Sequence, residues 1–135
     1  MSWTSEALDH LRRAHELEVA TLGRDGVLRP FVLIWLVVVD DRLYVRTWHR
    51  RDTGWYGRAL RSRRARVRVP GVEADVDVTD LGADDPVLRE QVDAAYLSAY
   101  GSHGTGSVAA MVAEEAATTT LRLEPATTPT AARPT

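Results

Sequence analysis

The pattern of hydrophobic residues predicts an α+β protein built on a small antiparallel β-barrel. Three observations support this class. Several segments alternate apolar and polar residues with period two, as half-buried strands do. Turn dipeptides such as Asp25-Gly26 and Pro70-Gly71 separate neighbouring segments, which favours antiparallel pairing. Segments with helical spacing lie before, between and after the strands. The 135 residues are enough for one domain of this kind with its own core.

The N-terminal part predicts a helix followed by the first strand of a meander. Thr4 can cap a helix over residues 5–15, whose leucines lie on one face. Residues 17–22 alternate apolar and polar side chains, as a strand does. Asp25-Gly26 is typical of a hairpin turn, so a second strand must follow.

That second strand is predicted over residues 27–39. It contains the continuous apolar run Phe31–Val39, which is rich in branched side chains. We interpret this run as one strand covered on both faces, at the centre of the barrel. Asp40-Asp41 then turns the chain, and residues 42–48 alternate as the third strand of the meander.

The next segment predicts a loop, a short helix and a hairpin. Residues 49–54 are polar, and residues 55–63 carry apolar side chains at helical spacing. Residues 64–69 and 72–79 alternate on either side of Pro70-Gly71, as the two strands of a hairpin do.

The hairpin pattern also predicts its register. With Pro70-Gly71 as the turn, three arginines face three acids across the ladder: Arg68 faces Glu73, Arg66 faces Asp75 and Arg64 faces Asp77. Opposite charges in such positions contribute roughly 0.2–1 kcal/mol each. Pro-Gly favours a type II turn, which fits hairpin twist less well than the primed types, so a register shifted by one residue stays open.

The C-terminal third predicts two helices, a strand and a tail. Asp85-Pro86 starts a helix that runs to about Tyr100, and a glycine-rich segment breaks it. Residues 107–116 predict another helix, and residues 118–124 a final strand with Leu121 and Leu123 inward. We expect one domain over residues 1–124 and a disordered Thr/Ala/Pro tail over residues 125–135.

Composition excludes several classes of protein. The absence of cysteine removes disulfides, thiolate metal sites and cysteine nucleophiles. The histidines lack metal-ligand spacing, so no metal site is expected. The longest apolar run is far shorter than the ~20 residues of a membrane-spanning helix. The first residues have neither the basic start nor the apolar core of a signal peptide. We therefore expect a soluble, cytoplasmic protein that binds no membrane.

The basic residues gather in the middle of the chain. All 17 are arginine, and ten of them lie in residues 42–68 beside a single acid, Asp52. The net charge of −2 therefore hides a basic segment between acidic flanks. The lack of lysine resembles the codon bias of a GC-rich genome, so position is more informative than residue type. Three interpretations stay open: a solvated basic face, a site for a phosphate-bearing small ligand, and a nucleic-acid site, which the acidic flanks oppose.

Several stretches resemble a known family. They are Ile34-Trp35 in the long apolar run, Leu43–Thr47, Gly54-Trp55-Tyr56, Asp93–Tyr96 and Ala117–Leu123. Together they resemble an uncharacterised bacterial family of the pyridoxamine-phosphate-oxidase-like, FMN-binding split-barrel superfamily. The resemblance covers most of the chain up to Glu124 and implies a split β-barrel of about six strands with flanking helices.

The resemblance also implies a function and a site. It implies a homodimer that holds FMN or a deazaflavin coenzyme in a groove between subunits and acts as an oxidoreductase on a small organic molecule. Carried onto this sequence, the residues that would bind the cofactor are Arg46, Thr47, Arg50, Arg51, Trp55 and Arg58. This chain departs from the family pattern before Tyr100, where Ser98-Ala99 stands in place of an expected basic residue.

Two residues are candidates for proton transfer. His49 stands beside two arginines and Asp52, and Tyr56 carries a phenol near the same loop. They would also serve an alternative function on the same barrel: a cofactor-free cyclase, isomerase or lyase, or a simple ligand-binding protein. Trp35 is expected in the core, with the wall of a ligand groove as the alternative.

Overall fold

The computed structural model describes residues 3–14, 16–47, 54–82, 84–100 and 114–126. The predicted α+β class is confirmed. The elements of the described chain are α1 (Ser5–Arg13), β1 (Leu17–Thr21), β2 (Val32–Ile34), β3 (Val37–Val39), β4 (Arg42–Val45), α2 (Gly54–Ser62), β5 (Arg64–Val69), β6 (Val72–Asp80), α3 (Pro86–Tyr100), α5 (Glu114–Ala117) and β7 (Leu121–Pro125).

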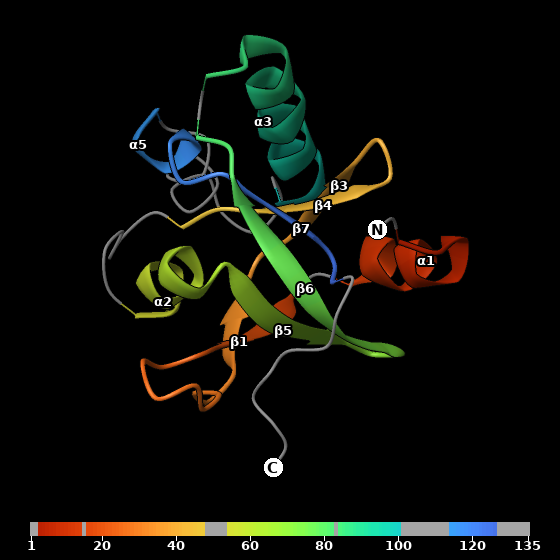
Figure 1. The fold of residues 1–135 in the computed structure, drawn as a ribbon. Coiled ribbons are helices and arrows are strands. Elements are labelled where there is room, and N and C mark those ends of the chain that lie inside the picture. The colour runs from red at the N-terminus through yellow and green to blue at the C-terminus, as the bar shows by residue number, and fades with distance from the viewer. Residues whose placement is uncertain (1–2, 15, 48–53, 83, 101–113, 127–135) are drawn as a thin grey trace.

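The seven described strands form one antiparallel sheet in the order β2-β1-β5-β6-β7-β4-β3. Strands β2 and β3 occupy the two opposite edges, although only Trp35 and Leu36 separate them in the chain. Successive Cα atoms are about 3.8 Å apart, so the three steps from Ile34 to Val37 span about 11 Å at most. The two edges must therefore lie close together. The sheet is curled into a barrel that is split between β2 and β3, with α1, α2 and α3 on different sides of it (Figure 1).

The prediction of one central strand over residues 27–39 is wrong. The run forms two short strands at the two edges of the sheet, which is why the sheet has seven strands instead of six. Val32 and Leu33 are 37% and 54% exposed, so this part of the run is not covered on both faces. The uninterrupted apolar run suggested one strand, because Trp35 and Leu36, which connect the two edges across the split, are themselves apolar. The antiparallel pairings of the predicted meander are found, since β2 pairs with β1 and β3 pairs with β4, but its middle strand is interrupted at Trp35 and Leu36.

The predicted hairpin register is confirmed. Strands β5 and β6 place Arg64 opposite Asp77, Arg66 opposite Asp75 and Arg68 opposite Glu73. Gly71 has φ of 90°, which fits the second central position of a type II turn after proline.

One ion pair of that hairpin differs from the prediction. Arg64 and Arg66 do bind their cross-strand acids. Arg68 instead binds Glu18, its neighbour on β1, with 2.7 Å between Nε and Oε1. Because β5 lies between β1 and β6, Arg68 has an acid on both sides, and the sequence pattern of the hairpin shows only one of them.

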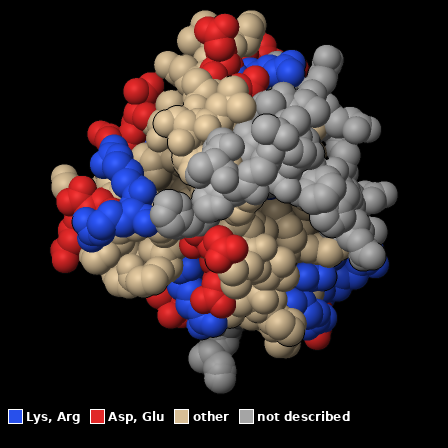
Figure 2. All heavy atoms as spheres, turned by 180° about the vertical axis from the view of Figure 1, so that it is seen from behind, with Lys and Arg blue, Asp and Glu red and all other residues tan. Residues whose placement is uncertain are grey.

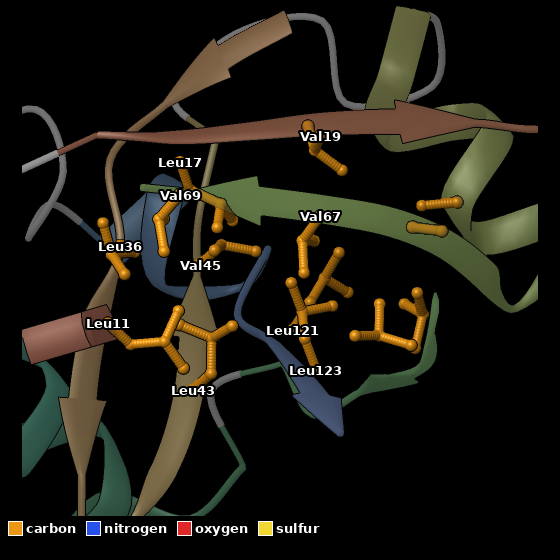
Figure 3. Packing of buried hydrophobic residues seen from close by; sticks show 14 of the residues in the cluster. Leu11, Leu17, Val19, Leu36, Leu43, Val45, Val67, Val69, Leu121 and Leu123 are labelled. Atoms are coloured by element: carbon orange, nitrogen blue, oxygen red, sulfur yellow. The ribbon is translucent and has the colours of Figure 1, made fainter. Parts of the chain in front are cut away.

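The barrel is filled by aliphatic side chains from both halves of the sheet and from two helices. Figure 3 shows Leu17, Val19, Val45, Val67 and Leu121 converging on the interior. Helix α1 closes one side with Leu8 and Leu11, and α2 contributes Tyr56 and Ala59. The inward orientation predicted for Leu121 and Leu123 is confirmed, since both are buried.

Helix α3 covers the outside of β3 and β4. Its residues Val92, Tyr96 and Tyr100 pack with Val37 and Tyr44 in a second buried cluster. The predicted start of this helix is confirmed: an oxygen of the Asp85 carboxylate accepts from the backbone N–H groups of residues 87 and 88, both at 3.1 Å.

The remaining predictions differ mainly at element ends. Thr4 caps α1 as predicted, and its hydroxyl accepts from the N–H of Ala7 at 3.1 Å. The final strand begins at Leu121, three residues later than predicted, because residues 118–120 form a turn before it. The glycine-rich segment, most of the predicted 107–116 helix and residues 127–135 of the tail lie outside the described residues.

Candidate functional site

Half of the described arginines in the basic segment are neutralised by carboxylates. This part of the chain contains eight described arginines, at positions 42, 46, 58, 61, 63, 64, 66 and 68. Four are in ion pairs: Arg46–Asp93 at 2.6 Å, Arg64–Asp77 at 3.0 Å, Arg66–Asp75 at 2.7 Å and Arg68–Glu18 at 2.7 Å. Figure 2 shows the same mixing on one face of the molecule, where blue and red side chains lie side by side. These four guanidiniums are therefore already bound by carboxylates, one of which, Asp93, also pairs with Arg89 at 3.6 Å.

Helix α2 retains its positive charge. Arg58 is half-buried, and its Nε donates to the hydroxyl of Thr21 at 2.9 Å. Arg61 and Arg63, at the end of the helix and just after it, are exposed. Among the described residues, no carboxylate forms an ion pair with any of these three. Of the four described arginines of the basic segment without an ion pair, three therefore lie on α2 or directly after it, and the fourth, Arg42, lies on β4.

The sequence of α2 explains why its arginines face outward. Tyr56 and Ala59, three residues apart, are buried against the barrel. Arg63, with φ of 58°, ends the helix in a left-handed conformation, and its N–H donates to the carbonyl of Ala59 at 2.8 Å. With this face fixed against the barrel, Arg58 starts on another side of the helix, stays half-buried and contacts Thr21 at the end of β1 through its Nε.

Trp55 lies next to Arg58 on the helix surface. Positions three residues apart in a helix are neighbours. Its ring is half-buried and meets the Tyr56 ring edge-on, with 5.8 Å between centroids and 88° between planes. An aromatic ring and an unneutralised guanidinium therefore occupy adjacent positions on α2, a combination that suits a ligand with both a flat ring and an anionic group.

Arg46 is buried, unlike Arg58, the other described arginine among the predicted cofactor residues. Its side chain has no exposed surface. Its Nε donates to the Thr120 hydroxyl at 2.9 Å, and one Nη donates to Asp93 at 2.6 Å. The guanidinium also lies 5.6 Å from the centre of the Tyr96 ring. Burial raises the pKa of the Tyr96 phenol, which therefore stays neutral beside the cation. Arg46 thus joins β4 to α3 and β7.

Thr47 continues this internal connection. Its N–H donates to the Thr119 hydroxyl at 3.0 Å, and that hydroxyl donates to the Thr47 carbonyl at 2.8 Å. The end of β4 is therefore held by the threonines that precede β7.

Of the two predicted catalytic residues, the structure describes only Tyr56. Tyr56 is 4% exposed and belongs to the barrel core. His49, together with Arg50 and Arg51, lies outside the described residues.

Sequence reasoning missed four partners of the predicted residues, namely Thr21, Asp93, Thr119 and Thr120. All except Thr21 stand in the two C-terminal stretches that carry the family resemblance, and that was their only signal. Thr21 gave none, since a threonine at the end of an alternating strand is ordinary.

Trp35 and Tyr100 close the split of the barrel. Their rings are stacked, with 4.3 Å between centroids and 6° between planes. The Tyr100 hydroxyl accepts from the N–H of Leu36 at 3.1 Å and donates to its carbonyl at 2.6 Å. Tyr100 thus bonds the crossing segment as a neighbouring strand would. Trp35 packs in the second cluster, as expected of a core residue, although it stays half-buried.

Two other kinds of site are absent from the described residues. They contain no group of three or more His, Asp or Glu side chains placed to hold a metal ion. None of the described helices is long and apolar enough to cross a membrane.

The curled sheet and its flanking helices define the class of protein, a split β-barrel. Structures with this fold include the heme storage protein HutZ from Vibrio cholerae, with a TM-score of 0.63 and 11% identity over 95% of this chain and 93% of that one. The conserved hypothetical protein Rv2991 from Mycobacterium tuberculosis matches with a TM-score of 0.62 and 14% identity over 91% and 79%. An FAD-binding protein from Mesorhizobium loti matches with a TM-score of 0.54 and 17% identity over 91% and 88%.

The sequence identifies the family within this class. Residues 7–123 match the family described as an uncharacterised protein conserved in bacteria (DUF2255), and the chain belongs to it. The expected membership of an uncharacterised bacterial split-barrel family is thereby confirmed. No curated protein matches the sequence significantly.

Proposed function

We propose that this protein is a cytoplasmic homodimer that binds a phosphorylated flavin or deazaflavin coenzyme at α2 and uses it as an oxidoreductase on a small organic molecule. The observation that carries the proposal is the unneutralised charge of α2. Acids neutralise the arginines at positions 46, 64, 66 and 68, whereas Arg58 is held by a neutral hydroxyl. A phosphate group is the natural counter-ion for such a guanidinium.

The proposal moves the phosphate anchor away from Arg46. That residue is fully buried and already paired with Asp93, so its role is to hold α3 on the sheet. Arg58 takes the role of the main phosphate contact, and Arg50 and Arg51 assist from the preceding segment. Thr47 supports the end of β4, and Trp55 contacts the ring system.

The residues present fit the phosphate end of such a coenzyme. Arg58 and Trp55 are adjacent on one helix surface, and both are partly exposed. A bound flavin or deazaflavin would supply the hydride or electron chemistry, while the chain binds and orients it. His49 remains the candidate for moving a proton near this site.

The fold supports the binding of a ring-containing ligand but does not select a particular coenzyme. The heme storage protein and the FAD-binding protein have split barrels, so this fold accommodates flat, ring-containing ligands in other proteins. The specific choice of a phosphorylated flavin comes from the charge and the aromatic ring on α2, together with the family resemblance.

The direct test is a titration of the purified full chain with FMN, FAD, a deazaflavin and hemin, followed by absorbance and fluorescence. The proposal predicts that a phosphorylated flavin binds, and that riboflavin, which lacks the phosphate, binds more weakly. Size-exclusion chromatography with light scattering should give a dimer. Binding of hemin alone, or of no coenzyme, would overturn the proposal.

A matched pair of variants tests the assigned site. Arg58→Ala should weaken FMN binding by about 1.5–3 kcal/mol, because it removes charge-assisted hydrogen bonds to the phosphate. Arg42→Ala is the control, since Arg42 is also exposed and has no carboxylate partner among the described residues. It lies on the β3–β4 hairpin, on the opposite side of the barrel from α2 (Figure 1). Equal losses in both variants would refute the assignment.

The alternative function keeps the barrel without a redox coenzyme. The sequestration of Arg46 by Asp93 favours it in one respect, because the arginine suggested by the family resemblance is not available to a phosphate. On this alternative, the α2 arginines bind an anionic metabolite that is not a flavin. Native mass spectrometry of the purified protein that shows a bound non-flavin anion would favour it.

A further inference from the structure

The hydroxyl of Thr21 holds the Arg58 guanidinium by one atom only. Thr21 is the last residue of β1 and is completely buried. It accepts a hydrogen bond from Nε of Arg58 at 2.9 Å, and this contact joins α2 to the end of the strand. The contact lies in the barrel wall below the surface on which Arg58 emerges.

This single contact determines which edge of the guanidinium is available. An arginine side chain has one N–H on Nε and four on its two Nη atoms, all in one plane. With Nε directed at Thr21, the edge formed by the two Nη atoms points away from the strand. No described residue bonds those Nη atoms. That edge presents two parallel N–H groups, the geometry that binds two oxygens of a phosphate or carboxylate.

Thr21 is itself held rigidly. Its carbonyl accepts from the N–H of Arg29 at 2.8 Å, and its backbone pairs with Ala65 on β5. These contacts fix the backbone of Thr21, and its side chain is completely buried, so little further entropy is lost when the hydroxyl positions a partner. The hydroxyl is therefore a stable anchor for Arg58.

The choice of a hydroxyl has an electrostatic consequence. A carboxylate at this position would bind Nε equally well and would cancel the charge, as Glu18 does for Arg68 through Nε at 2.7 Å. A threonine fixes the same atom and leaves the whole positive charge for a ligand. The Thr21–Arg58 pair thus combines fixed orientation with full charge, a combination that a purely structural ion pair does not provide.

We propose that Thr21 is a positioning residue that presents the Nη edge of Arg58 to a terminal phosphate monoester, so that the pair sets the preference for a phosphorylated ligand over its dephosphorylated form. This inference rests on the proposed function. It adds a residue outside the basic segment and assigns it to the phosphate end of the ligand.

The test compares FMN with riboflavin, because the two differ only in the phosphate. Thr21→Val keeps a branched side chain in the strand and removes the hydroxyl, and Thr21→Ser keeps the hydroxyl. Thr21→Val should weaken FMN binding about tenfold and leave riboflavin binding unchanged, because Arg58 loses its orientation and not its charge. Thr21→Ser should keep the wild-type ratio of the two dissociation constants. Urea unfolding of each variant separates this effect from loss of structure.

A second substitution keeps the test decisive if Thr21→Val folds poorly. Arg58→Lys keeps the charge but cannot bond Thr21 and bind a phosphate through two parallel N–H groups at once. It should lower the preference for FMN over riboflavin as Thr21→Val does. A wild-type preference in a folded Thr21→Val or in Arg58→Lys overturns the inference and leaves the proposed function intact. Failure of the wild-type protein to bind any flavin overturns both.

Discussion

The hydroxyl of Tyr100 offers the sharpest test of how the barrel is closed. Tyr100→Phe removes two hydrogen bonds, at 3.1 Å and 2.6 Å, to the buried backbone N–H and carbonyl of Leu36. The ring remains, so the stack on Trp35 is kept. Each buried backbone group left without its partner costs about 1–3 kcal/mol, which gives a total loss of about 2–6 kcal/mol. For a chain of this length, at about 4 °C per kcal/mol, this lowers Tm by about 8–24 °C.

Tyr44→Phe is the matched control for this substitution. Tyr44 is also buried, at 3% exposure, in the same cluster as Tyr100. No hydrogen bond of its hydroxyl is found among the described residues, so the control should change the free energy of unfolding by less than about 0.5 kcal/mol. Urea unfolding and calorimetry measure both variants. If Tyr100→Phe costs no more than Tyr44→Phe, the account of the closed split is wrong.

Tyr100 also predicts that the stability of the protein depends on pH in the alkaline range. Burial raises the pKa of Tyr100 to about 12, from its ordinary value of 10. A group whose folded pKa is raised favours the folded state fully below its unfolded pKa. This contribution is lost as the pH rises from 10 towards 12, because the unfolded chain then ionises first. The free energy of unfolding of the wild-type protein should fall more steeply over this range than that of Tyr100→Phe.

Three further predictions test other contacts. Asp93→Ala leaves the buried Arg46 without its carboxylate and should cost about 3 kcal/mol, whereas the double replacement Arg46→Met with Asp93→Leu should cost much less; urea unfolding distinguishes the two. Arg63→Gly should raise the free energy of unfolding by about 1 kcal/mol, because glycine adopts the left-handed φ of 58° without strain, and an unchanged value would contradict this. The hydrogen bond from Arg68 lowers the pKa of Glu18 below 4.5. The ion pair between Glu18 and Arg68 therefore stabilises the folded state fully above that pH, and this stabilisation is lost as the pH falls further. The free energy of unfolding should consequently fall less steeply with decreasing pH in Arg68→Gln than in the wild-type protein.

The local pattern of the sequence was sufficient for most of the elements. The alternation on both sides of Pro70-Gly71 gave the register of the β5–β6 hairpin, because side chains one residue out of register would face the wrong side of the sheet. Asp85-Pro86 gave the start of α3 through a capping geometry that depends only on neighbouring residues.

Contacts between distant segments could not be predicted in the same way. An uninterrupted apolar run such as Phe31–Val39 does not show which face each residue covers, so its division into two edge strands was missed. Likewise, nothing near Arg68 in sequence indicates that Glu18 will be its partner, because β1 joins β5 from 50 residues away.

For the candidate site, the sequence indicated a region of the chain and not the environment of each arginine in it. The sequence located the basic segment and the aromatic residues beside it. It did not distinguish Arg46, which Asp93 neutralises inside the protein, from Arg58, which keeps its charge at the surface. That distinction depends on burial and on partners from three different elements, and only the folded structure supplies both.

The most direct test of the central claim is a fluorescence titration of FMN and riboflavin with the purified full-length protein at low ionic strength. The proposed site predicts saturable quenching of FMN and a dissociation constant for riboflavin at least tenfold higher, because only FMN carries the phosphate for Arg58. Equal dissociation constants for the two flavins, or no quenching of either, would contradict the claim that α2 is a phosphate-binding element.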